Sequence, residues 1–250
     1  MDAKQWDRIA GCYHAEIVSP FTKGIVNPIF EHLDRIKSSE KIVADLGTGT
    51  GPLLGFLSER FKEVHAIDFS QKMIKAAKQN NRQNNIIFTV TDLRDLSDYK
   101  NKFDVCCACN SVILPSIVDV KKIFSEIYAS IKPSGVFLGI FPSMESVLYN
   151  GTLVLHREID NCDDEQKAIR KAERISDIKD YKFLQGIYKN RPGELQKFYY
   201  KFGLKYILKK EGFKDVSIEK VLYPWRDDVS DFENFPKEEP MWDWFVSCRK

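Results

Sequence analysis

The chain has 250 residues, which is long enough for one domain with a full hydrophobic core. Hydrophobic residues make up 43% of it and charged residues 30%, as is typical of globular proteins. The 38 basic residues nearly balance the 36 acidic ones. The resulting formal net charge of +2 excludes a strong overall field for nucleic acid or an anionic membrane, although it leaves room for a local basic patch.

The sequence has no apolar run that approaches the roughly 20 residues needed to cross a bilayer. Its first stretch, MDAKQWDRIAGCYH, carries scattered charges and lacks the apolar centre of a secretory signal. We therefore expect a cytoplasmic protein that starts at Met1, has no membrane association and keeps its six cysteines as reduced thiols. Cys106, Cys107 and Cys109 fall in an apolar run that predicts a buried strand, so we expect core residues and no metal site.

Residues 1–40 precede the first predicted strand, and their apolar residues follow helical spacing from Ile25 to Ile36. We expect them to form a helical lid outside the sheet. Apolar and β-branched runs then predict strands at 41–46, 63–68, 86–91, 103–109, 135–141, 214–222 and 242–248. The stretches between them predict a helix that begins at Pro52, a helix over 70–80 with Ser70 as its N-cap, and a helix over 117–131.

Strands that alternate with helices and are apolar on both faces indicate a parallel sheet covered on both sides. The predicted fold class is α/β, with a doubly wound, mostly parallel sheet. The alternation stops after Phe141, and residues 143–200 are charged and helical in character. We expect a helical insertion after the fifth strand that caps the carboxyl edge of the sheet. A single domain would comprise the lid (1–40), a cofactor-binding core (41–142), the insertion (143–200), and a C-terminal helix with the last two strands (201–250).

The strongest motif is the strand-to-helix turn Asp45-Leu-Gly-Thr-Gly-Thr-Gly51. Glycines permit a tight turn and let the backbone approach a ligand closely. Asp45 and the spacing G-x-G-x-G narrow the class of ligand, because a carboxylate repels a pyrophosphate but suits a cation. S-adenosylmethionine carries an ammonium and a sulfonium and no phosphate. A nicotinamide dehydrogenase would instead favour G-x-G-x-x-G without Asp45.

With this turn, the sequence resembles the class I, Rossmann-like S-adenosylmethionine-dependent methyltransferases, over about residues 40–142 and more faintly in the last two strands. The resemblance implies a seven-stranded sheet whose last strand is antiparallel. It implies that Asp68 binds the ribose hydroxyls, that Asp92 faces the adenine amino group, and that Asn110 passes beside the methionine part. The cofactor-binding residues that it implies are Asp45, Gly47, Thr48, Gly49, Gly51, Asp68, Phe69, Met73, Asp92, Leu93 and Asn110.

Purely structural roles remain open for the same polar residues. Asp45 and Asp68 also suit helix caps, Asp92 suits a solvated loop acid, and Asn110 suits a turn residue. Similarly, the acids from Asp160 to Glu165 are more typical of a helix start than of a metal site.

The expected reaction is in-line transfer of a methyl group from S-adenosylmethionine to a small-molecule acceptor, in which positioning supplies much of the rate. A weakly acidic acceptor also needs a base, for which the sequence offers only Tyr13 and His14 in the predicted lid. The candidate acceptor-binding residues are aromatic, since aromatic walls pack against flat or cationic substrates: Trp6, Tyr13, Tyr199 and Tyr200. The last two fit equally well into a core beneath the insertion.

Two alternatives concern the acceptor and the activity. A macromolecular methyltransferase would act on RNA or protein. Against it stand the near-neutral charge, the lack of an appended nucleic-acid module, and Asn110-Ser111-Val112 where an Asn-Pro-Pro-Tyr motif would follow the fourth strand. A non-catalytic partner subunit that binds S-adenosylmethionine is the second alternative.

Overall fold

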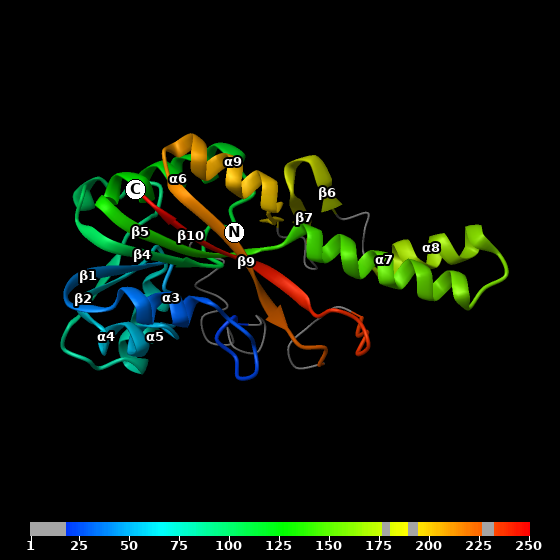
Figure 1. Ribbon diagram of the computed structural model, residues 1–250, viewed down its shortest axis with the longest axis horizontal. Coiled ribbons are helices and arrows are strands. Elements are labelled where there is room, and N and C mark those ends of the chain that lie inside the picture. The colour runs from blue at the N-terminus through cyan, green and yellow to red at the C-terminus, as the bar shows by residue number, and fades with distance from the viewer. Residues whose placement is uncertain (1–18, 177–180, 190–194, 227–232) are drawn as a thin grey trace.

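The computed structural model describes residues 19–176, 181–189, 195–226 and 233–250. Its centre is a seven-stranded sheet with the strand order β3-β2-β1-β4-β5-β10-β9 (Figure 1). The strands are β1 Ser38–Leu46, β2 Phe61–Asp68, β3 Ile86–Val90, β4 Phe103–Cys109, β5 Ile131–Pro142, β9 Lys214–Tyr223 and β10 Met241–Arg249. Strands β1 to β5 pair in parallel, whereas β10 runs antiparallel to both β5 and β9. The predicted fold class, including the reversed last strand, is confirmed.

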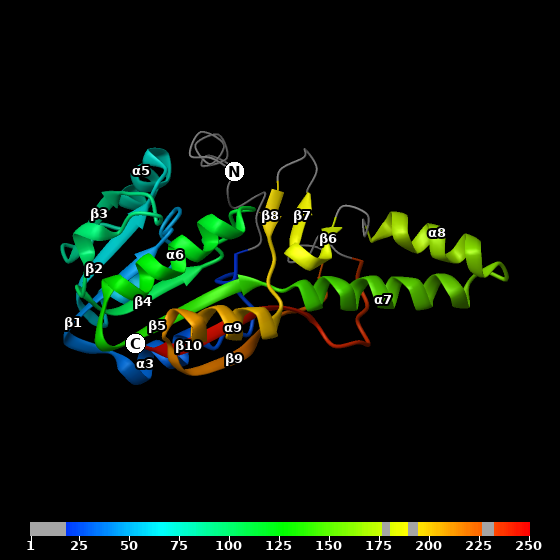
Figure 2. The same ribbon diagram turned by 90° about the horizontal axis from the view of Figure 1, so that it is seen from above.

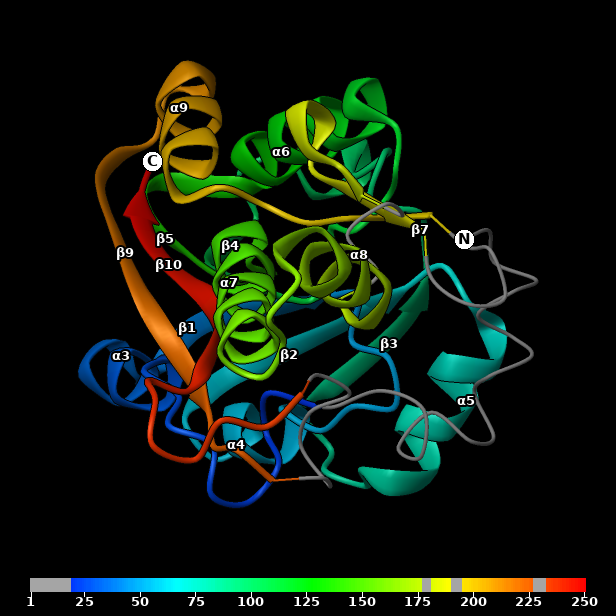
Figure 3. The same cartoon turned by 90° about the vertical axis from the view of Figure 1, so that its right-hand side faces the viewer.

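Helices cover both faces of this sheet, as Figure 3 shows. On one face, α6 (Ile117–Ser130) and α9 (Lys201–Glu211) bury apolar side chains in the same cluster as β4 and β5. On the other face lie α3 (Ile29–Ile36), α4 (Leu54–Ser58) and α5 (Gln71–Asn80). The chain order reverses direction between β1 and β4, where open α/β sheets bind ligands beyond the carboxyl ends of their strands.

Serine caps fix the helices that start at this carboxyl edge. The side-chain oxygen of Ser70 accepts a hydrogen bond from the Met73 N–H at the start of α5, which confirms the predicted N-cap. Ser116 caps α6 in the same way. The helix after the glycine turn differs from its prediction, because it begins at Leu54 and Pro52 stays in the preceding turn.

Of the three cysteines of β4, Cys106 and Cys107 are buried core residues, whereas Cys109 is only partly buried. Cys106 packs with the cluster beneath α6, whereas Cys107 and Cys109 lie with the cluster on the opposite face. Burial raises the pKa of the Cys106 thiol to about 12, so it stays protonated at neutral pH. Because Cys106 and Cys107 belong to different clusters, these adjacent residues face opposite sides of the sheet, as the sequence predicts.

The insertion after β5 has a helical and a β part. Helices α7 (Met144–Asp160) and α8 (Glu165–Ile175) form a hairpin that projects outward from the carboxyl edge (Figures 1 and 2). The β part is a small antiparallel sheet that the sequence does not predict, made of β6 Tyr181–Lys182, β7 Ile187–Lys189 and β8 Leu195–Lys197. The α7–α8 hairpin extends away from the seven-stranded sheet. The capping role expected for residues 143–200 stays a prediction. Asp164 caps α8, so this acid-rich stretch starts a helix as expected.

Across the described ranges, we find no helix with the length and apolar character that a membrane crossing demands. The same residues contain no group of three or more His, Cys, Asp or Glu side chains that could hold a metal ion.

Candidate active site

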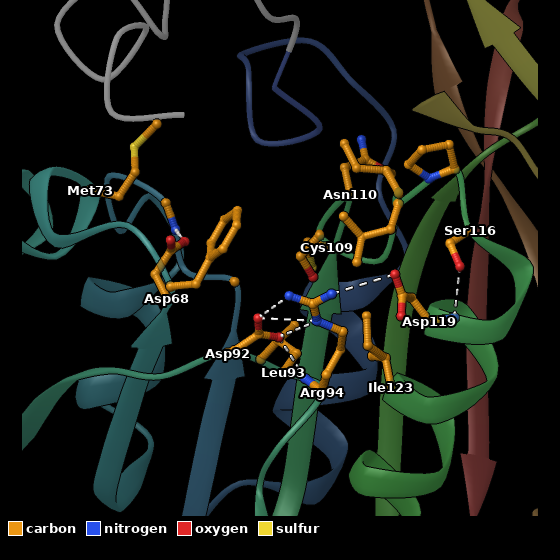
Figure 4. Close-up of a pocket in the computed structure, with 17 residues that line it drawn as sticks. Asp68, Met73, Asp92, Leu93, Arg94, Cys109, Asn110, Ser116, Asp119 and Ile123 are labelled. Atoms are coloured by element: carbon orange, nitrogen blue, oxygen red, sulfur yellow. Dashed lines mark hydrogen bonds and ion pairs between the residues drawn. The ribbon is translucent and has the colours of Figure 1, made fainter. Parts of the chain in front are cut away.

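A pocket of about 420 Å³ opens at the carboxyl edge of β1, β2 and β4. It lies where the strand order reverses, and Figure 4 shows side chains from the ends of β2 and β4, from the loop after β3 and from α6 around it. The lining residues come from the strand ends and the loops that follow them: Gly47, Gly49, Asp68, Phe69, Met73, Asp92, Leu93, Arg94, Cys109, Asn110, Ser111, Ile113, Leu114, Pro115, Ser116, Asp119 and Ile123.

The glycine turn after β1 forms the floor of the pocket. Gly47 has a φ of 72°, a conformation that side chains of L-residues disfavour. A Cβ atom on Gly47 would lie 2.2 Å from the Cβ of Ser111, so the turn packs directly on the end of β4. The backbone N–H of Gly47 also donates to the Ile67 carbonyl of β2 at 2.7 Å. The absence of a side chain thus lets three strand ends meet around one cavity.

Asp68, at the end of β2, braces the turn from the other side. Its Oδ2 accepts from the Gly49 N–H at 2.9 Å, and its Oδ1 accepts from the Ser70 N–H at 2.9 Å. The residue is 5% exposed. A carboxylate can accept up to about four hydrogen bonds, so this side chain suits a ligand hydroxyl as well as the backbone N–H groups.

An ion-pair chain crosses the pocket between the loop after β3 and the start of α6. Arg94 donates to both carboxylate oxygens of Asp92, with an Nη2–Oδ2 distance of 2.6 Å, and its Nη1 lies 3.4 Å from Asp119 Oδ2 (Figure 4). The Arg94 guanidinium beside it lowers the pKa of the Asp92 carboxyl. Asp92 is therefore held ionised and bound to a neighbouring side chain.

The end of β4 supplies polar atoms that lack partners. Asn110 adopts a left-handed φ of 49°, and its Nδ2 donates to Asp243 Oδ2 of β10 at 3.1 Å. Its Oδ1 and the Ser111 Oγ are buried and have no hydrogen-bond partner among the described residues. Buried polar atoms are normally paired, so these two atoms point to a ligand that donates hydrogen bonds.

The comparisons with known proteins agree on one family. The model of a family described as "methyltransferase domain" matches residues 43–135. A solved structure of a Burkholderia thailandensis 1,6-didemethyltoxoflavin-N1-methyltransferase, with that compound and S-adenosylhomocysteine bound, superposes with a TM-score of 0.62. It is 14% identical, and the match covers 99% of this chain and 86% of that one. Residues 43–135 thus match a methyltransferase domain, and the fold around them is that of the class I, Rossmann-like methyltransferases. This family uses S-adenosylmethionine.

Relatives of the methyltransferase domain act on different kinds of acceptor, as their names state. A malonyl-[acyl-carrier protein] O-methyltransferase of Coxiella burnetii is 27% identical over 57% of this chain and 58% of that protein. A ribosomal protein L11 methyltransferase of Thermoanaerobacter pseudethanolicus is 32% identical over 43% of this chain and 34% of that protein. This chain thus matches a third to about three-fifths of these two relatives' lengths, and their acceptors do not transfer to it.

The pocket of the methyltransferase domain fits S-adenosylmethionine in size and chemistry. Its volume of about 420 Å³ lies within the range of small-molecule sites. Its lining contains three carboxylates, from Asp68, Asp92 and Asp119, against the single cation of Arg94. This balance suits a ligand with an ammonium and a sulfonium and no phosphate. The unpaired oxygens of Asn110 and Ser111 add acceptors for an ammonium.

Most of the residues that the sequence proposes for the cofactor line this pocket, and three do not. Gly47, Gly49, Asp68, Phe69, Met73, Asp92, Leu93 and Asn110 lie on its wall. Asp45, Thr48 and Gly51 lie behind it and shape the turn. The Thr48 hydroxyl donates to Asp45 Oδ2 at 2.7 Å, while Gly51, with a φ of 80°, packs on Leu54 and Asn81.

Of the candidate acceptor-binding residues, the two that the structure describes, Tyr199 and Tyr200, do not line the pocket. Tyr199 is 1% exposed, packs on Phe141 and donates from its hydroxyl to the Val112 carbonyl. The structure therefore corrects its expected role as a pocket wall, because the side chain is enclosed in the core beneath α6. Tyr200 stacks on Phe202 at the start of α9 and does not line the pocket. Trp6, Tyr13 and His14 lie outside the described residues.

The structure adds pocket residues that sequence reasoning missed. They end β4 or follow β3 and β4 in the chain: Arg94, Cys109, Ile113, Leu114, Pro115, Ser116, Asp119 and Ile123. One available signal was Ser116 three residues before Asp119, since a serine and an acid at this spacing mark the start of a helix at a strand end.

Asp45 gives the methyltransferase domain a specific dependence on pH. Burial raises the pKa of its carboxyl to about 6, against an ordinary value of 3.8, and the nearby charge of Asp68 adds to the rise. Between pH 3.8 and about 6, the Asp45 carboxyl is mostly protonated in the folded state and mostly ionised in the unfolded state. The stability that this proton confers is therefore lost as pH rises through about 6.

Replacing Asp45 by asparagine should remove this loss, because the amide still accepts from Thr48 and does not titrate. The free energy of unfolding of Asp45→Asn, relative to the unsubstituted chain, is expected to rise by about 2 kcal/mol between pH 4 and pH 7. Urea denaturation at several pH values measures it. The exposed Asp98→Asn serves as control and should show no such trend. A pH-independent difference for Asp45→Asn would contradict the expectation.

Proposed function

We propose that this protein is an S-adenosylmethionine-dependent methyltransferase that acts on a small-molecule acceptor by in-line displacement. The pocket at the carboxyl edge of β1, β2 and β4 carries this proposal, because its wall combines the glycine turn, Asp68 and the unpaired oxygens beyond β4. When bound, S-adenosylmethionine supplies a methyl group on a sulfonium, which an acceptor nucleophile can attack.

The chain's own residues bind and orient in this proposal. Gly47 and Gly49 line the pocket with backbone, and Asp68 places its carboxylate beside them, where ribose hydroxyls could donate to it. Phe69 and Met73 provide an apolar surface for the adenine ring of the cofactor beside Asp68. These contacts fix the reacting centre relative to the acceptor, which is the main contribution that a methyltransferase requires of its protein.

A small acceptor is favoured by the shape of the pocket beyond these residues. The lining continues along Ile113, Leu114 and Pro115 to Ile123, which makes a compact apolar wall next to polar Ser111 and Ser116. Such a lining, with few polar groups, is typical of small-molecule sites. The projecting hairpin of α7 and α8 favours the alternative, a macromolecular acceptor, because it extends outward from the same edge of the sheet (Figure 2).

Radiolabelled methyl transfer separates these acceptors. Purified protein is incubated with S-[methyl-³H]adenosylmethionine and either the small-molecule, the RNA or the protein fraction of a cell extract. Label is expected in the small-molecule fraction, and its appearance should depend on Asp68. Label in RNA or protein alone would replace the proposed acceptor class. Cofactor binding without transfer to any fraction would favour the non-catalytic partner subunit.

Arg94 should tune the preference between the charged cofactor and its neutral-sulfur product. Its removal by Arg94→Ala makes the pocket more negative by one charge, because Asp92 and Asp119 lose their common partner. The ratio of the dissociation constants of S-adenosylhomocysteine and S-adenosylmethionine is expected to rise about threefold. Calorimetry with both ligands at low salt measures the ratio. Arg82→Ala, which removes an exposed cation after α5, should leave it unchanged.

A further inference from the structure

Asp243 lies at the start of β10, across the sheet edge from the pocket residue Asn110. Its Oδ2 accepts from the Tyr223 hydroxyl at 2.7 Å and from Asn110 Nδ2 at 3.1 Å. Donors from the end of β4 and from β9 thus meet on one acid of β10.

An ionised carboxylate accepts hydrogen bonds and donates none, which decides the orientation of the amide beside it. Asn110 must present its NH2 group to Asp243, and its Oδ1 must then point the other way. In that orientation Oδ1 is buried and has no partner in the described part of the chain. The backbone reinforces the arrangement, since the Asn110 N–H is bound to the Ile140 carbonyl at 2.9 Å and its φ is 49°.

We infer that Asp243 is a positioning residue that holds the Asn110 amide with its oxygen available to a hydrogen-bond donor of the cofactor, namely the ammonium of its amino-acid part. This inference rests on the proposed function. Figure 4 shows Asn110 across the pocket from Asp68 and Met73. If Asp68 binds the ribose, the amino-acid part extends toward Asn110. A buried amide oxygen without a partner is costly, so a cationic donor there would bind strongly.

The test replaces Asp243 by asparagine, which keeps the size of the side chain but adds a donor. The new NH2 group can bind the Asn110 oxygen, which would turn the amide around and withdraw that oxygen from the ligand. Two probes separate this effect from general damage. S-adenosylhomocysteine has the ammonium, and 5′-methylthioadenosine keeps the adenosine and sulfur without the amino-acid part.

At pH 8, where Asp243 is ionised, Asp243→Asn is expected to weaken S-adenosylhomocysteine binding about tenfold and to leave 5′-methylthioadenosine binding within about twofold. The matched control is Asp104→Asn at the amino end of β4, where a carboxylate accepts from the Ile42 N–H and Lys132 at 2.8 Å each. It makes the same chemical change far from the pocket and should leave both affinities unchanged. Asn110→Gly, which suits a positive φ, should reproduce the selective loss without a further loss in the double variant.

The outcomes separate the inference from the proposed function. Equal binding of S-adenosylhomocysteine by Asp243→Asn and the unsubstituted chain would overturn the inference, as would an equal loss for both probes. If Asp243→Asn does not fold, Asn110→Gly tests the amide oxygen that the inference requires, and unchanged binding of S-adenosylhomocysteine by that variant would overturn the inference. Failure of the unsubstituted chain to bind S-adenosylhomocysteine would instead reject the proposed function.

Discussion

Replacing Asp68 by alanine is expected to weaken S-adenosylmethionine binding between about tenfold and a hundredfold, the range for hydrogen bonds to a charged group. The carboxylate is 5% exposed and already organises the Gly49 and Ser70 N–H groups. Its loss removes the proposed acceptor for ribose hydroxyls and also takes away the carboxylate that binds the Gly49 and Ser70 N–H groups. Calorimetric titration of the variant with S-adenosylmethionine measures the effect.

The control for this substitution must separate binding from stability. Asp98→Ala removes an exposed acid from the loop after β3 and should leave both the affinity and the melting temperature unchanged. Asp68→Asn retains one acceptor oxygen and should bind with an affinity between those of Asp68→Ala and the unsubstituted chain. If folded Asp68→Ala bound within twofold of the unsubstituted chain, Asp68 would have no role in cofactor binding.

Substituting alanine for Gly47 should destabilise the domain by about 2–4 kcal/mol and reduce cofactor binding. The added Cβ would lie 2.2 Å from the Ser111 Cβ, a distance that forces the ends of β1 and β4 apart. The φ of 72° adds backbone strain for any residue with a side chain. Chemical denaturation and calorimetric titration of the same variant give the two effects.

Gly55 in α4 provides the matched control for this prediction. A Cβ at Gly55 would lie no closer than 3.8 Å to Gln83, so Gly55→Ala should fit. Because alanine favours helix over glycine, this variant should gain up to about 1 kcal/mol of stability and bind the cofactor normally. Equal stability of the Gly47 and Gly55 variants would show that the turn tolerates side chains and does not require its glycines.

The sequence predicts the sheet well where the signal is local. The apolar run Phe103–Cys109 marks a strand with the bounds that the structure has, and Ser70 caps the helix that follows β2. Strand β5 begins earlier than predicted, at Ile131, because pairing with Phe103 extends it before Pro133 and Ser134. The small sheet of β6 to β8 was missed because its short charged strands have no periodic signal and depend on pairing with one another.

The candidate site shows the same division between local and distant information. Residues that follow strands directly, such as Asp68 and Asn110, could be proposed because parallel strands bring their carboxyl ends together. Asp243 could not, since 133 residues separate it from Asn110 and its own strand reads as an ordinary apolar run. Tyr199 was ambiguous for a related reason, because only the packing of β5 against α6 decides whether an aromatic at that position is enclosed.

Cofactor binding by the unsubstituted chain is the central claim, and calorimetric titration with S-adenosylhomocysteine tests it most directly. The product analogue avoids turnover and carries the same adenosine and amino-acid groups as the cofactor. Saturable binding of one ligand per chain with a micromolar dissociation constant is the predicted result. A folded protein that releases no binding heat and shows no thermal stabilisation at millimolar ligand would contradict the claim, and the glycine turn would then serve a different ligand.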